Sequence, residues 1–175
     1  MSWLVFTNLY VGFCGAALTY ATYPLIGQPP RLNAVVAIVF CATLLIYNLD
    51  RLAERSTGGS AHARWVDEHR PVLWALTLLA GLGCVAWAPQ LTGPARWSLL
   101  LPAGISLGYC LPCWRWHGRW RRLKQLPTAK LLLIALVWTY ATALLPLINA
   151  SALALELQRK GLVGKKKASK PFKAK

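Results

Sequence analysis

The sequence predicts an all-α integral membrane protein, a bundle of about five transmembrane helices. Hydrophobic residues make up 56% of the chain and charged residues only 14%, whereas a soluble domain carries about 25% charged residues. The charges are also clustered, so that long apolar runs alternate with short polar stretches. Because an ionised side chain in hydrocarbon costs several kcal/mol, this pattern is typical of a chain whose main partner is the lipid bilayer.

Five continuous apolar segments are long enough to cross a membrane as helices. A bilayer core needs about 17–25 helical residues, and transmembrane strands would instead show short segments of alternating polarity. We expect spans at residues 3–25, 34–50, 72–88, 97–113 and 130–148. Within the fourth segment, Gly104 and Gly108 form a small-xxx-small pair, which predicts close packing against another helix.

The basic residues predict the orientation of this bundle. The loops at residues 50–71 and 114–130 together hold ten Lys and Arg residues, whereas the opposite loops hold only Arg31 and Arg96. By the positive-inside rule, both basic loops and the N-terminus are cytoplasmic, and a bacterial inner (plasma) membrane is the expected location. The net charge of +15 does not indicate nucleic acid, because the sequence contains no zinc-finger, RNA-binding or basic-heptad pattern.

The chain divides into a transmembrane domain at residues 1–150 and a polybasic segment at residues 151–175, which we expect to be disordered. Eight basic residues follow the fifth span and would emerge on the side opposite the other basic loops. Either the fifth segment does not finish crossing the membrane, or residues 151–175 are not the natural continuation of the chain.

Two of the five acidic residues, Asp50 and Glu54, stand four positions apart at the end of the second apolar segment. On a helix this spacing projects both carboxylates from one face. Mg²⁺ usually binds one or two carboxylates together with substrate phosphates, so the pair predicts a magnesium site. In the alternative interpretation, the interleaved Arg51 and Arg55 simply neutralise the two acids at the membrane interface.

The segment Tyr-Asn-Leu-Asp-Arg-Leu-Ala-Glu, which ends at Glu54, resembles the first aspartate-rich motif of the UbiA prenyltransferase superfamily. That motif has an Asn, an Asp four residues later and another Asp four beyond it. Asp50 matches the middle acid and Glu54 stands at the last, whereas Ile46 occupies the Asn position. A second segment, Trp-Arg-Arg-Leu-Lys-Gln-Leu-Pro, is similar to the family's aromatic-x-x-x-Lys-Arg-x-Thr pattern, and Lys124 matches its Lys.

The resemblance implies an intramembrane all-α enzyme that uses Mg²⁺ to transfer a prenyl group from a prenyl diphosphate to an aromatic or other acceptor. The residues implied to catalyse the reaction and bind the metal are Asp50 and Glu54, and those implied to bind the diphosphate are Lys124, Arg51 and Asn48. The resemblance covers about residues 1–148, the first half of a nine-helix fold, and no acidic pair follows Lys130. We therefore expect the chain to be incomplete as a monomeric enzyme. It is a truncated member, a half whose cavity a homodimer completes, or a degenerate relative with another task.

Two other classes of function stay open. Cys110 and Cys113 have the C-x-x-C spacing of thiol–disulfide exchange sites, which is consistent with a membrane oxidoreductase. Their predicted cytoplasmic position counts against it, because thiols stay reduced there. The other alternative is a non-catalytic membrane subunit or scaffold that is held by helix packing and anchored by its basic tail.

Overall fold

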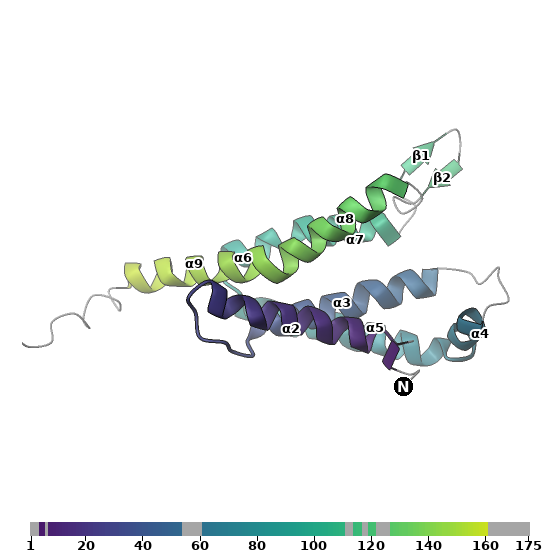
Figure 1. Cartoon of the computed structure of the whole chain (residues 1–175), viewed down its shortest axis with the longest axis horizontal. Helices are drawn as coiled ribbons and strands as arrows, with labels where there is room; N and C mark the ends of the chain where they lie inside the picture. The colour runs from purple at the N-terminus through teal and green to yellow at the C-terminus, as the bar shows by residue number, and fades with distance from the viewer. Residues whose placement is uncertain are drawn as a thin grey trace, which may run out of the picture.

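The computed structural model describes residues 4–5, 7–53, 61–110, 114–116, 119–121 and 127–160, and these are predominantly helical (Figure 1). The elements are α2 (Leu9–Leu25), α3 (Ala34–Ala53), α4 (Ala61–Glu68), α5 (Arg70–Trp87), η1 (Ala88–Gln90), α6 (Gly93–Ser98), α7 (Leu100–Cys110), β1 (Trp114–Trp116), β2 (Arg119–Arg121), α8 (Pro127–Thr139), η3 (Tyr140–Leu144) and α9 (Leu145–Arg159). The helical class predicted from the sequence is confirmed. The short antiparallel hairpin β1–β2 is an addition that the apolar pattern did not indicate.

Helix α3 is the centre of the bundle. It packs along α5 and α2 and also contacts α7 and α9. Its start is set by Asn33, whose side-chain Oδ1 accepts hydrogen bonds from the backbone N–H groups of Val35 and Val36. This is the N-cap interaction that satisfies otherwise unpaired amides at a helix start. Consistent with the central position, eight of the residues in α3 are buried.

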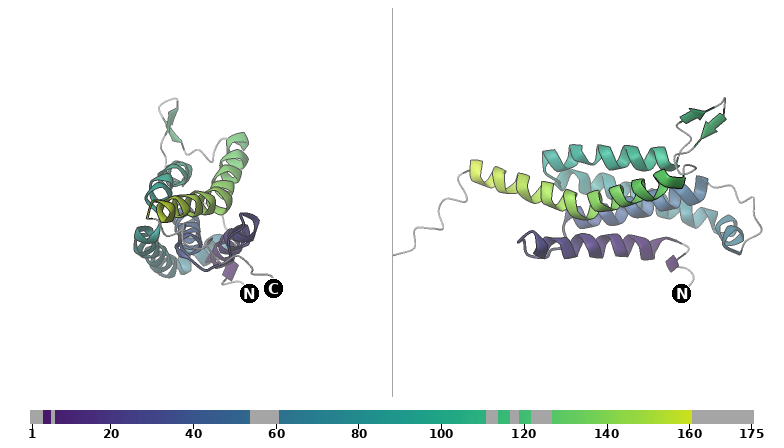
Figure 2. Two further views of the ribbon diagram at one scale, coloured as in Figure 1. Left: turned by 90° about the vertical axis from the view of Figure 1, so that its left-hand side faces the viewer. Right: turned by 45° about the horizontal axis from the view of Figure 1, so that its top comes forward.

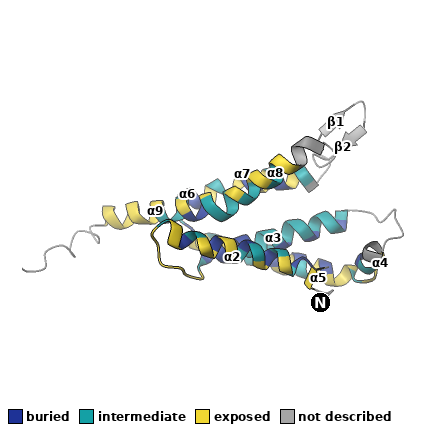
Figure 3. Cartoon of the chain, in the orientation of Figure 1, coloured by how far each residue is buried: buried dark blue, intermediate teal, exposed yellow. Residues whose placement is uncertain are grey.

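Three helices are long and apolar enough to cross a membrane: Ala34–Ala53, Arg70–Gln90 and Leu131–Arg159. They correspond to the second, third and fifth predicted spans. Exposed residues lie along the outside of the bundle (Figure 3), and on α5 the large apolar residues Leu78, Leu79, Leu82 and Val85 are 63–72% exposed. A continuous apolar surface of this kind is unfavourable in water and suits contact with lipid. The chain therefore has the helices of a membrane protein.

Glycines set the closest helix contacts, but not at the predicted position. A Cβ added to Gly12 on α2 would lie 3.1 Å from the Phe40 ring, and one added to Gly83 on α5 would lie 2.6 Å from the Cys41 sulfur. Among the described residues, a Cβ at Gly104 would meet nothing within 4 Å, so the helices of this chain do not make the close contact predicted at that position. The spacing of small residues marks a smooth helix face, but which helix faces a neighbour is decided by the packing of the whole bundle.

At two of the prolines within helical segments, a hydroxyl group from another helix replaces the missing backbone donor. Pro102 in α7 has no N–H to donate to the carbonyl of Ser98, and the Tyr140 hydroxyl donates to that carbonyl at 3.0 Å. Pro146 in α9 likewise has no N–H for the carbonyl of Thr142, to which the Thr22 hydroxyl donates at 2.8 Å. In a bilayer, where water cannot satisfy a freed backbone group, such side-chain donors make helix-breaking residues tolerable.

The two ends of the bundle differ. The start of α2, the end of α3, α4 and the β1–β2 hairpin gather at one end, and α9 projects past the other helices at the opposite end (Figures 1 and 2). Helix α9 continues to Arg159, beyond residue 150 where we placed the start of the tail. The segment Ser151–Leu157 is rich in Ala and Leu, which favour helix, and this explains the continuation. Residues 161–175 lie outside the described part.

Candidate functional site around Asp50

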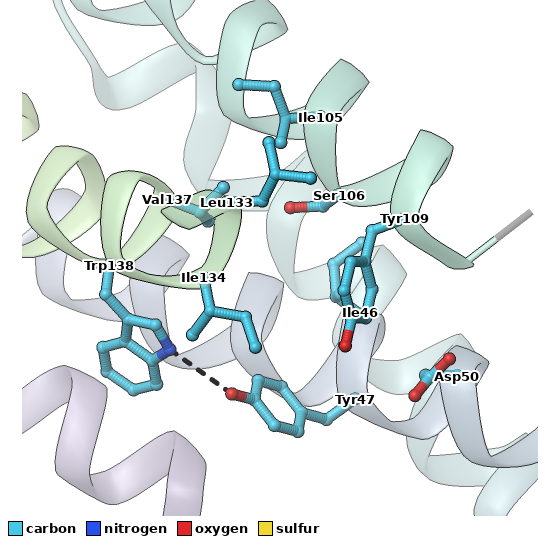
Figure 4. Close-up of a pocket in the computed structure, with 10 residues that line it drawn as sticks. All are labelled: Ile46, Tyr47, Asp50, Ile105, Ser106, Tyr109, Leu133, Ile134, Val137 and Trp138. Atoms are coloured by element: carbon cyan, nitrogen blue, oxygen red, sulfur yellow. Dashed lines mark hydrogen bonds between the residues drawn. The ribbon is translucent and has the colours of Figure 1, made fainter. Parts of the chain in front are cut away.

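Asp50 lies near the C-terminal end of α3 and borders a cavity of about 120 Å³ (Figure 4). Helices α3, α7 and α8 line the cavity. Its lining residues are Ile46, Tyr47, Asp50, Ile105, Ser106, Tyr109, Leu133, Ile134, Val137 and Trp138. Asp50 is half-buried, at one edge of the cavity, and Trp138 lies at the opposite edge. A carboxylate thus stands at the border of an otherwise mainly apolar pocket.

Each helix presents the cavity with side chains at nearly the same spacing. On α3 and α7 the lining residues stand at positions i, i+1 and i+4, and α8 adds one more at i+5. Residues at i, i+1 and i+4 share one side of a helix, so three helices with this pattern can face a common space. The repeated spacing explains why short segments from three parts of the chain converge on one site.

The hydroxyl groups at the cavity have defined surroundings. The Tyr47 hydroxyl accepts a hydrogen bond from Trp138 Nε1 at 3.3 Å, which connects α3 to α8 across the pocket (Figure 4). Ser106 is buried at 9% exposure, and Tyr109 is half-buried on the same helix. The sequence pattern indicated Asp50 but not Ser106, Tyr109 or Trp138, because their convergence depends on how α7 and α8 pack against α3.

Of the other predicted site residues, Arg51 and Asn48 are described, and neither lines the Asp50 cavity. Arg51 is half-buried and does not line the cavity. Asn48 is fully buried and accepts a hydrogen bond at 2.7 Å from the side-chain amide of Asn8, at the start of α2. Its contact with α2 separates it from the Asp50 cavity. Glu54 and Lys124 lie outside the described residues.

The buried pair of Asn8 and Asn48 was not predicted as a unit. Asn8 is 2% exposed and has a φ of 59°, in the left-handed region that Asn tolerates better than most residues. Within the described residues the Nδ2 group of Asn48 has no hydrogen-bond partner. The signal available in the sequence was an Asn inside an apolar segment, which in a membrane helix indicates an interhelical hydrogen bond.

The C-x-x-C motif begins at the last residue of α7, Cys110. Cys113 and the side chain of Cys110 lie outside the described part of the chain. The cysteines with described side chains, Cys14, Cys41 and Cys84, are free thiols, half-buried within helices. The oxidoreductase alternative therefore stays a prediction.

The donor set at the cavity provides one carboxylate for a cation. Among the described residues no group of three or more His, Cys, Asp or Glu side chains is close enough to hold a metal ion. Mg²⁺ does not need such a group, because it commonly binds one or two carboxylates and takes its remaining ligands from phosphate and water. The chemistry of Asp50 fits a magnesium–diphosphate pair of this kind.

No family model, curated protein or solved structure matches this chain. The resemblance to the UbiA superfamily thus rests on the motif residues alone.

Proposed function

We propose that the chain is a UbiA-like membrane prenyltransferase, or a truncated relative of one, that binds a prenyl diphosphate at Asp50. The proposal includes five spans in a bacterial inner membrane, with the N-terminus and the loops at residues 50–71 and 114–130 cytoplasmic. The observation that carries it is the position of Asp50, which borders a mainly apolar cavity lined by three helices. A prenyl diphosphate has the same division, a charged head joined to an apolar chain.

In this proposal Asp50 and Glu54 would hold Mg²⁺, which when bound would supply positive charge to the diphosphate and make it a better leaving group. The residues that line the cavity have two further roles. Ile46, Ile105 and Val137 exclude water from the allylic carbon, which would otherwise be hydrolysed once the carbon–oxygen bond weakens. The aromatic faces nearby attract positive charge as it develops on that carbon. The acceptor then forms the new bond to the allylic carbon, the diphosphate departs with the bonding pair, and the proton lost from the acceptor passes to solvent.

The basic residues have separate roles in the proposal. Lys124 contacts the diphosphate oxygens, because an ammonium group is a compact partner for phosphate. Arg51 follows Asp50 directly and contributes positive charge at the same end of α3. Asn48 instead stabilises the position of α2 through Asn8, since its side chain is fully buried at that contact.

A binding experiment tests the site. Geranyl diphosphate is titrated into the full chain in detergent micelles, with Mg²⁺ and with EDTA, for the unsubstituted protein and for Asp50→Asn. We expect affinity to depend on Mg²⁺ and to fall at least about tenfold in Asp50→Asn, because one charged metal ligand is lost. Asp67→Asn is the matched control, since Asp67 is exposed on α4 and does not line the cavity.

Equal affinity of the unsubstituted protein and Asp50→Asn would refute the site assignment. Binding that is lost equally in Asp67→Asn would show a general effect of net charge. Mg²⁺-dependent binding without product formation from any aromatic acceptor would favour the non-catalytic subunit over the enzyme.

A further inference from the structure

A second and larger cavity, of about 490 Å³, lies between α2, α3, α5 and α9 at the opposite end of the bundle from α4. It is bordered by the connections after α2 and α5. Its polar lining residues are Tyr23, Gln28, Arg31, Asn33, Gln90 and Asn149. The volume is within the range of about 300–1,000 Å³ that is usual for small-molecule sites, so the cavity is large enough for a ligand head group.

Arg31 supplies the only formal charge among the residues that line this cavity. Within the described part of the chain its guanidinium has no ion pair and no hydrogen bond. The other arginine at this end, Arg96, is already engaged, because it donates to the carbonyls of Pro89 and Leu91. The cavity therefore contains one positively charged group that is able to bind an anion.

The amides around Arg31 increase the bias toward an anion. The Oδ1 atom of Asn149 accepts from both the backbone N–H and the hydroxyl of Thr92, which leaves its Nδ2 group as the donor. The Oδ1 atom of Asn33 is likewise occupied by the first amides of α3. The Nδ2 group of Asn33 donates to the Tyr23 hydroxyl at 2.7 Å. The Nδ2 group of Asn149 and the positive end of the α3 dipole therefore remain on the cavity side as partners for an anion.

The remaining walls are apolar and open outward. Leu32 is 85% exposed, and Trp87, Leu153 and Leu157 are also exposed. Trp and Arg at the end of a transmembrane bundle are typical of the membrane interface. Together these features describe a site for a molecule with an anionic head and an apolar body.

We propose that this cavity binds the phosphate group of an anionic amphiphile, with a membrane phospholipid as its source. Arg31 forms a charge-assisted hydrogen bond to the phosphate, and Gln28 and Gln90 border the rest of the head group. The acyl chains lie along Leu153 and Leu157 on α9. The proposal is independent of the function suggested for the Asp50 cavity, because no residue lines both sites.

Native mass spectrometry of the full chain tests the proposal. The protein is released from micelles that contain equal amounts of phosphatidylglycerol and phosphatidylcholine, and the retained lipids are counted. We expect phosphatidylglycerol to be preferred, and its retention to fall about tenfold in Arg31→Gln, as expected for loss of a hydrogen bond to a charged group. Arg64→Gln, which removes the same charge from the exposed surface of α4, should change retention less than about twofold.

A second pair of variants tests the apolar wall without changing charge. Ala154→Trp places a large side chain in the cavity, whereas Leu155→Trp changes an exposed residue that does not line it. We expect lipid loss in the first variant and retention in the second, with the same helical circular dichroism in both.

Addition of inorganic phosphate distinguishes the two sources of the anion. Displacement of the lipid by phosphate supports a site for the phosphate group alone, and resistance to displacement supports recognition of the whole amphiphile. Equal retention of the two lipids, or equal loss in Arg31→Gln and Arg64→Gln, would overturn the proposal.

Discussion

The hydrogen bond from Tyr140 to the Ser98 carbonyl allows a quantitative test of how this bundle tolerates proline. Substitution Tyr140→Phe removes the hydroxyl that donates at 3.0 Å, while the aromatic ring remains. Because Pro102 cannot donate to the same carbonyl, the substitution leaves Ser98 without this donor. Interhelical hydrogen bonds in membrane proteins contribute about 0.6 kcal/mol on average and up to about 1.7 kcal/mol. We expect a loss of about 1–1.5 kcal/mol, since the alternative donor is missing.

The second substitution in the test is Pro102→Ala, which restores a backbone N–H at position 102. This N–H can donate to the Ser98 carbonyl in the ordinary helical pattern, so the carbonyl no longer depends on Tyr140. In the Pro102→Ala background we therefore expect Tyr140→Phe to cost less than about 0.5 kcal/mol. The difference between the two backgrounds is the coupling energy of a double-mutant cycle.

The free energy of unfolding is measured for the four proteins of this cycle by denaturing-detergent titration in mixed micelles, with helical circular dichroism as the signal. Tyr10→Phe is the control, because Tyr10 is 62% exposed on α2 and its hydroxyl is not part of this contact. It should change stability by less than about 0.5 kcal/mol. An equal cost of Tyr140→Phe with and without Pro102 would refute the view that the hydroxyl replaces the missing amide.

Three further substitutions should each lower the free energy of unfolding, as measured by the same titration. Gly83→Ala should cost about 1–3 kcal/mol because its Cβ would lie 2.6 Å from the Cys41 sulfur, and Cys41→Ala should relieve most of that cost. Asn33→Ala should cost about 1 kcal/mol by removing the N-cap of α3, whereas Asn33→Asp should retain the cap. Asn8→Ala should cost about 1–3 kcal/mol because Asn48 loses its partner, and no loss would contradict the buried pair.

The sequence was sufficient to predict the helical class and the membrane character, because both depend on long apolar runs. The helix that begins at Ala34 and the one that includes Leu131 agree with the predicted second and fifth segments to within a few residues at their starts. The interruption of the fourth segment between α6 and α7 was not predicted. It occurs at Leu99, three residues before Pro102. The Ser98 carbonyl, to which Pro102 cannot donate, accepts a hydrogen bond from the Tyr140 hydroxyl on a distant helix, and no local pattern reveals this compensation.

The candidate site was predictable only in part, for a similar reason. Asp50 stood out because acids are rare in this chain and because of its place at the end of an apolar segment. Asn48, only two positions earlier, points to a different neighbour, since two residues on a helix are separated by about 200°. The aromatic and hydroxyl groups from α7 and α8 became part of the site through tertiary packing. Their i, i+1 and i+4 spacing is common in helices and identifies no site by itself.

The π-helical turn η3 connects the two cavities through the geometry of one continuous helix. Each π turn inserts one residue relative to an α-helix, which rotates the following residues by about 100°. Before η3, Trp138 faces the Asp50 cavity, and after it Asn149 faces the cavity at the other end. In a regular helix these two residues, eleven positions apart, would lie on nearly the same face, within about 20°. The inserted residue rotates α9 so that its side chains face a different direction from those of α8. The hydrogen bond from the Thr22 hydroxyl to the Thr142 carbonyl stabilises the π-helical turn where this rotation occurs. A single helix can therefore provide a wall for an acidic site at one end of the bundle and for a basic site at the other.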